Sequence, residues 1–89
     1  MKLSADGIDF EIFFEHYGPV TTCIVIWTTH GRTHVTGGYA ICNPKDIFDP
    51  VVGERMAMKR VCQHYVFGKS LYHAYRKLMY EAKKSGRQA

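Results

Sequence analysis

Apolar and polar residues alternate along the first part of the chain. Between residues 8 and 14 every second side chain is apolar, and the charged Asp9 and Glu11 lie between them. A period of two over this length is typical of a half-buried β-strand. The following run 20–29 is rich in β-branched and aromatic residues, which favours a second strand.

A third strand is predicted over residues 33–42, where the Gly37-Gly38 pair indicates a bulge or a close backbone approach. Turn residues at 16–19 and 30–32 separate the three runs and leave only short links. Consecutive strands joined by short links pair as antiparallel neighbours. We therefore expect a three-stranded antiparallel meander that covers residues 8–42.

The sequence changes to helical signals after a turn at Asn43-Pro44-Lys45-Asp46. Asp49 is placed to cap the free N–H groups of a helix, and Pro50 suits its first position. Apolar residues then recur at helical spacing, which predicts a helix over about residues 50–66. Gly68 is the expected terminator of this helix.

A second helix is predicted from about residue 70 to residue 85, with Ser70 as its cap and Gly86 as its stop. Its apolar stripe consists of Leu71, Tyr75, Leu78 and Ala82. The order of elements implies an α+β class, in which two C-terminal helices pack on one face of the sheet. Because the chain has 89 residues, we expect a single domain over 1–89.

Charge is distributed unevenly between the two halves of the chain. Residues 1–49 hold three basic and six acidic residues, a formal charge of −3, whereas residues 50–89 hold nine basic and two acidic residues, a charge of +7. A surface so polarised suits a phosphate backbone or an acidic protein partner. The sequence shows no membrane span and no signal peptide, and its three cysteines form no C-x-x-C pair, so a cytoplasmic location is expected.

Five features link the third strand to the first helix: Gly38-Tyr39-Ala40, Asn43-Pro44-x-Asp46, Gly53, Ala57 and Arg60. This pattern resembles a group of small bacterial and phage proteins with a double-stranded-RNA-binding-domain-like (dsRBD-like) fold. The resemblance covers roughly residues 36–62, and it implies a three-stranded sheet backed by a helix. It also suggests a phage origin.

The chain departs from the true double-stranded-RNA binders of that group. Their last helix opens with a Lys-Lys-x-Ala-Lys cluster, whereas the matching segment here, residues 53–60, carries Glu54 near its start. The fold resemblance therefore does not by itself imply conventional recognition of double-stranded RNA.

Motifs for catalysis or for a metal site are not found in the sequence. His30 and His34 flank a turn without a third ligand at a zinc-site spacing. Cys23 and Cys62 lie in apolar surroundings, which do not activate a nucleophile. We therefore expect no enzyme activity, no metal and no cofactor.

The leading functional prediction is nucleic-acid binding through the basic C-terminal helices. Cationic side chains would contact phosphates, and one tyrosine among them would stack on a base. The predicted contact residues are Lys59, Arg60, Lys69, Arg76, Lys77, Tyr80, Lys83, Lys84 and Arg87.

A protein-interaction role is the alternative that the sequence leaves open. The chain would then act on a host nucleic-acid-processing or defence complex, either by placing its basic face on an acidic host protein or through Asp9, Glu11 and Glu15. A homodimer, formed by the Tyr-rich second helix or by an exposed strand edge, also remains open.

Overall fold

A four-stranded antiparallel sheet followed by two helices makes up the chain, for which a computed structural model describes residues 1–86, the last two by backbone alone. The α+β class and the two C-terminal helices agree with the prediction. The prediction of three strands is wrong by one. The strands are β1 (Lys2–Ala5), β2 (Ile8–Tyr17), β3 (Val20–Thr29) and β4 (Arg32–Ile41), which neighbour one another in chain order.

The strand that was not predicted is β1, which a tight turn joins to β2. Asp6 and Gly7 both have positive φ angles, 53° and 74°, as a type I′ hairpin turn requires. His30 and Gly31 form the same kind of turn between β3 and β4, with φ angles of 52° and 75°. The Asp-Gly pair is a strong sequence signal for a hairpin. β1 does alternate between exposed and partly buried residues, but with only four residues it is too short for this alternation to stand out in the sequence.

The helix α1 (Pro50–Cys62) begins where the sequence predicts. The Asp49 side chain accepts a hydrogen bond of 3.0 Å from the Val51 N–H, and Pro50 occupies the first turn. The helix ends at Cys62, four residues earlier than predicted. Tyr65 therefore lies in the link between the helices, where its ring stacks on Phe67 at a centroid distance of 5.1 Å.

The predicted role of Gly68 as a helix terminator is wrong, and so is that of Ser70 as a cap. Helix α2 (Gly68–Gly86) begins at this glycine. A Cβ atom on Gly68 would lie 1.7 Å from the Cys62 carbonyl oxygen, so close approach of the two helix ends requires glycine here. Gly68 is therefore explained by its close contact with the end of α1, and not by a role in ending a helix.

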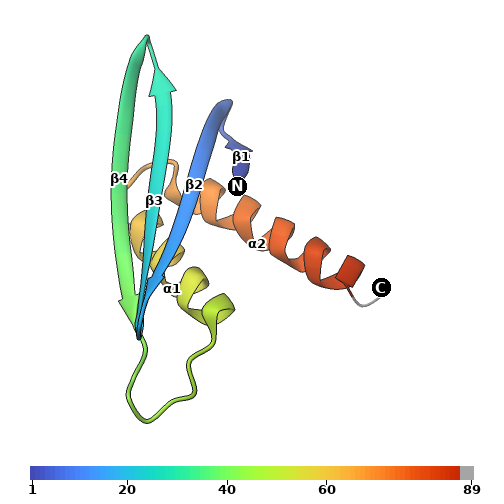
Figure 1. Cartoon of the computed structure of the whole chain (residues 1–89). Helices are drawn as coiled ribbons and strands as arrows, with labels where there is room; N and C mark the ends of the chain where they lie inside the picture. Colours follow the sequence, from blue (N-terminus) through green and yellow to red (C-terminus); the bar gives the residue numbers. More distant parts are fainter. Residues whose placement is uncertain (87–89) are drawn as a thin grey trace.

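Both helices cover the same face of the sheet, and the opposite face is open (Figure 1). Helix α1 lies against β3 and β4, whereas α2 crosses near β1. The core between the layers holds apolar side chains from both; the largest of them with less than 2% exposure are Tyr75, Phe10, Ile12, Met58, Leu71, Val25 and Val61.

Gly38 lets α1 approach the sheet closely. A Cβ atom on Gly38 would come within 2.8 Å of the Val61 Cγ2 atom. The pairing of β3 with β4 runs without interruption through Gly37 and Gly38, so the strand has no bulge. Of the two alternatives that the sequence offered for this glycine pair, the structure therefore shows the close approach.

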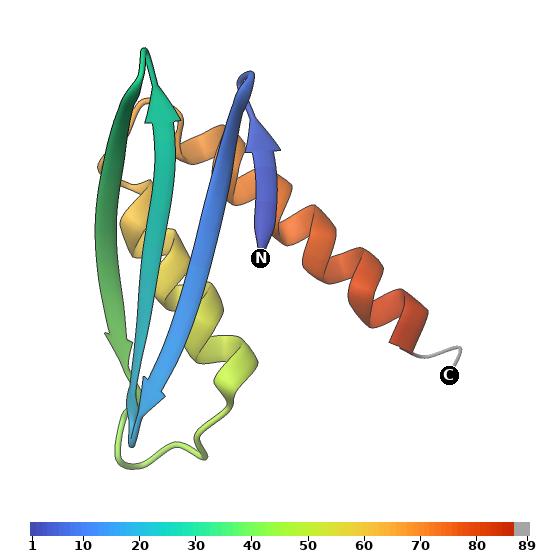
Figure 2. The ribbon, with the colours of Figure 1, turned by 45° about the horizontal axis from the view of Figure 1, so that its top comes forward.

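The C-terminal half of α2 extends beyond the sheet (Figure 2). Leu71 and Tyr75 are buried under the sheet, as their places on the predicted apolar stripe require. Leu78 is 36% exposed, and Ala82 is also exposed, so the predicted stripe is buried only in its first half. The end of α2 is thus a projecting arm.

Candidate nucleic-acid interface

The basic residues of α2 share one exposed face of the helix. At about 100° per residue, they fall within a sector of roughly 120° that lies opposite the buried Leu71 and Tyr75. We call this face the α2 stripe; all its members are exposed, and they are Lys69, Arg76, Lys77, Tyr80, Lys83 and Lys84. The structure thus brings six of the nine predicted contact residues together.

Cations of the α2 stripe have no ion-pair partner among the residues that the structure describes. The one contact within 4.0 Å between a basic and an acidic side chain in that part of the chain joins His16 to Glu54, and neither residue belongs to the stripe. Tyr80 is 69% exposed at the middle of the positive face, with its ring accessible to a planar ligand. The stripe can therefore offer both ammonium donors and a stacking surface.

The stripe is long enough to follow a nucleic-acid backbone. From Lys69 to Lys84 the helix rises about 22 Å at 1.5 Å per residue. One strand of B-form DNA carries a phosphate about every 3.4 Å of axis, so this length matches about six phosphate positions. Because these residues lie on a helix, their backbone positions are set before any ligand binds.

Lys59 and Arg60 lie outside the stripe. Lys59 lines a shallow groove of about 350 Å³ with Lys69, between the end of α1 and the start of α2. Arg60 points to the other side of α1, where its Nη1 atom donates a hydrogen bond of 2.8 Å to the Tyr39 carbonyl oxygen. Arg87, the last predicted contact residue, lies outside the described residues.

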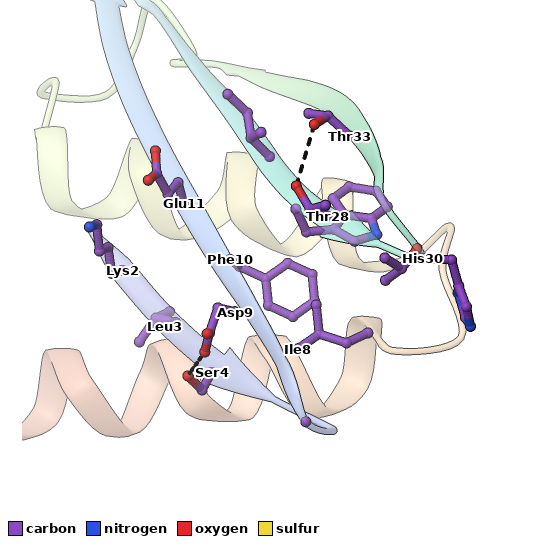
Figure 3. Close-up of a pocket in the computed structure, with 14 residues that line it drawn as sticks. Lys2, Leu3, Ser4, Ile8, Asp9, Phe10, Glu11, Thr28, His30 and Thr33 are labelled. Carbon is purple, nitrogen blue, oxygen red and sulfur yellow. Dashed lines mark hydrogen bonds between the residues drawn. The ribbon is translucent and has the colours of Figure 1, made fainter.

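A hollow of about 1000 Å³ lies elsewhere, between the β1–β2 hairpin and β3 (Figure 3). It forms because pairing of β2 with β3 ends at Phe10, so that Ile8 and Asp9 diverge from β3. Its charged lining residues are Lys2, Asp9 and Glu11, and the Ser4 hydroxyl donates to the Asp9 carboxylate. The excess of carboxylates makes this hollow unsuitable for phosphate.

Two hydrogen bonds through His16 link β2, β3 and α1, and the sequence did not predict them. His16 Nε2 lies 2.8 Å from Glu54 Oε2, and His16 Nδ1 lies 3.0 Å from Thr21 Oγ1. In the tautomer whose Nε2–H donates to the carboxylate, Nδ1 accepts from the Thr21 hydroxyl. Thr21 is fully buried, so a substrate cannot reach this hydroxyl, and the three residues tie the layers together.

Burial governs the titration of three side chains in the core. It raises the pKa of the Cys23 thiol to about 12, that of Cys62 to about 11 and that of the Tyr75 hydroxyl to about 12. All three groups are therefore neutral near neutral pH. The buried thiols remain in their unreactive, protonated form.

Two further properties bear on possible ligands. Within residues 1–86, His, Cys, Asp and Glu side chains do not gather in any group of three that could hold a metal ion. The same part of the chain contains no helix that combines the length and apolar character of a membrane span.

Comparison of the chain with protein-family models, curated proteins and solved structures found no match. The resemblance to dsRBD-like proteins stays a prediction.

Proposed function

We propose that this protein binds nucleic acid through the α2 stripe. The observation that supports this function is the set of five exposed cations around the exposed ring of Tyr80, on a helix that projects from the domain. Phosphate contacts by lysine and arginine supply affinity through counterion release. Stacking on Tyr80 adds contact with an unpaired base.

The chemistry of the stripe also limits what kind of recognition to expect. Lysine and arginine contacts to phosphates position a protein on a strand but carry no sequence information. The described stripe has no asparagine or glutamine to read base edges, and Tyr80 can stack on any base. Binding should therefore be strongly dependent on salt and weakly dependent on sequence.

Fluorescence anisotropy with labelled single-stranded and duplex DNA and RNA of equal length, at low and physiological salt, tests this function. The variant Lys83→Glu/Lys84→Glu should bind about tenfold or more weakly, because each reversal replaces a phosphate contact by a repulsion. The dependence of log K on log salt should also become shallower by about 2.

The matched control is Lys2→Glu/Lys45→Glu, which changes the net charge equally at two exposed lysines outside α2. This control should retain binding within about twofold if contact, and not net charge, supplies the affinity. An equal loss in both double variants would contradict a specific role of the stripe. Failure of the unaltered protein to bind at low salt would overturn the proposed function.

The open face of the sheet favours a second candidate function, interaction with another protein. Phe13, Ile24 and Tyr39 are 39% to 58% exposed on this face, beside the carboxylates of Glu11 and Glu15. An apolar patch with an acidic margin suits a basic partner surface, such as that of a nucleic-acid-processing or defence complex. Under this function Glu11→Lys/Glu15→Lys would abolish activity in the cell, and Lys83→Glu/Lys84→Glu would leave it unchanged.

A further inference from the structure

The outer edge of β4 carries backbone groups that no other strand pairs. β4 is the last strand of the sheet, and in both ribbon views no element lies beside its outer edge (Figures 1 and 2). The Cys42 N–H donates to the Pro19 carbonyl, which sets the even-numbered residues as those bonded to β3. The N–H and C=O groups of Thr33, Val35 and Gly37, and those of Tyr39, therefore point outward.

This edge lacks the usual protection against pairing with another strand. β4 has ten residues, no proline and a single charged residue, Arg32. Arg60 covers one outward carbonyl, that of Tyr39, and a carbonyl oxygen still has a second lone pair for another donor. Val35 and Tyr39 are 64% and 58% exposed, so the edge is also apolar. A long, apolar and unprotected edge is a template for strand addition.

The pattern of residues along β4 is complementary to itself. In an antiparallel pair of two β4 strands centred on Gly37, Val35 of one copy lies opposite Tyr39 of the other, and Gly37 faces Gly37. Pairs of aromatic and β-branched residues stabilise antiparallel strands. The two Tyr39 rings would also cover the bare backbone at Gly37. We propose that a second copy of this chain pairs along β4 in this register, giving one continuous sheet of both protomers.

Charge complementarity supports the same register. Arg32 of one copy comes opposite Cys42 of the other, at the end of β4 where Asp46 lies. Asp46 is close to Cys42, whose Sγ atom is 3.9 Å from the Asp46 carbonyl oxygen. The two-fold symmetry forms this Arg32–Asp46 pair twice, once at each end of the paired strands.

An apolar groove continues from the β4 edge to the outer side of α1. It has a volume of about 390 Å³, and its apolar lining includes Ile41, Ile47, Val52 and Met56. Ile47 is 95% exposed, which is unusual for a residue of this size at a free surface. Antiparallel pairing of β4 about Gly37 places the two grooves at opposite ends of the joined strands, each beside the β3–β4 turn of the other copy.

The open face of the sheet is a weaker candidate for self-association. Two copies packed face to face would bring the Glu11 and Glu15 carboxylates of both into one interface. Like charges in such a contact oppose binding. The β4 edge has no acidic side chain of its own and offers hydrogen bonds as well as apolar contact.

Sedimentation velocity of the full chain, from micromolar to millimolar concentration, tests the proposal. The unaltered protein should form a dimer whose population rises with concentration. Val35→Pro removes an outward N–H without breaking the hydrogen bonds to β3. This variant should remain folded by circular dichroism and should sediment as a monomer. A monomer at every concentration, or a dimer that Val35→Pro leaves intact, would overturn the proposal.

If Val35→Pro does not fold, exchanging the charges of the Arg32–Asp46 pair tests the same interface. Arg32→Asp and Asp46→Arg should each weaken self-association about tenfold, because each places like charges at both ends of the interface. An equimolar mixture of these two variants restores both opposite-charge pairs and should dimerise as the unaltered chain does. A mixture no tighter than either variant alone would count against the register. The proposal does not rest on nucleic-acid binding, so Lys83→Glu/Lys84→Glu should still dimerise.

Discussion

Burial raises the pKa of the Cys23 thiol from 9.0 to about 12, and that of Cys62 from 9.0 to about 11. Each thiol ionises more easily in the unfolded chain than in the folded one. Their contribution to stability is therefore complete below pH 9.0 and is lost as the pH rises toward the folded pKa values. The same burial separates these two cysteines from Cys42, which is partly exposed at the end of β4.

Thiol labelling near neutral pH tests this difference between the cysteines. In the folded protein a maleimide should modify Cys42 first, because the other two thiols are protonated and covered. All three should react once urea unfolds the chain. Peptide mass spectrometry after short exposures gives the order, and equal labelling of Cys23 and Cys42 without urea would contradict the described core.

At the scale of elements, two glycines set the distance between α1 and the sheet. Gly38 lies on the sheet side of this contact and Gly53 on the helix side, and a Cβ atom on Gly53 would lie 2.4 Å from Thr21 Oγ1. That hydroxyl is fully buried and takes part in the link to His16 and Glu54. The helix, the sheet and this polar link therefore depend on one close approach.

Gly53→Ala should lower the free energy of unfolding by about 1–3 kcal/mol, the usual cost of overpacking a core. The gain in helix propensity from glycine to alanine, at most about 1 kcal/mol, opposes this loss but does not exceed it. Urea denaturation measures the difference. Val51→Ala, at an exposed position two residues earlier and outside the groove beside β4, is the matched control and should change stability little. Equal stability of Gly53→Ala and the unaltered chain would show that α1 can shift freely.

At the scale of the whole molecule, the folded body and the projecting arm differ in how far their side chains are buried. Core residues of α2 lie in its first two turns, at Leu71 and Tyr75. Beyond Met79 every side chain that the structure describes is exposed. The arm therefore contributes little to the core, and its positive charge is available to a ligand.

A chain that ends at Met79 should separate folding from binding. Its thermal midpoint should change by no more than about 5 °C, which corresponds to about 1 kcal/mol in a domain of this size. Its salt-dependent affinity for nucleic acid should fall, because Lys83, Lys84 and Tyr80 are removed. Circular dichroism and fluorescence anisotropy measure the two properties. Unchanged binding by this shorter chain would place the interface on the body instead.

The sequence predicted one part of the candidate site correctly and another part incorrectly. Helical spacing was enough to predict that Arg76, Lys77, Tyr80 and the two lysines after it share an exposed face. Arg60 belongs to the same basic half of the chain but points to the β4 edge, because the direction of its side chain depends on how α1 lies against the sheet. The link between His16 and Glu54 joins residues 38 positions apart, and no local pattern predicts it.

Local patterns in the sequence were enough to predict the α+β class, the three long strands, the cap of α1 at Asp49 and the polarity of charge, because alternation, capping and charge are local properties of the chain. The end of α1, the role of Gly68 and the exposed second half of α2 became clear from the three-dimensional structure alone. These depend on how the two helix ends approach each other across a short link, and on where the sheet ends beneath α2. Local propensity contains no information about either.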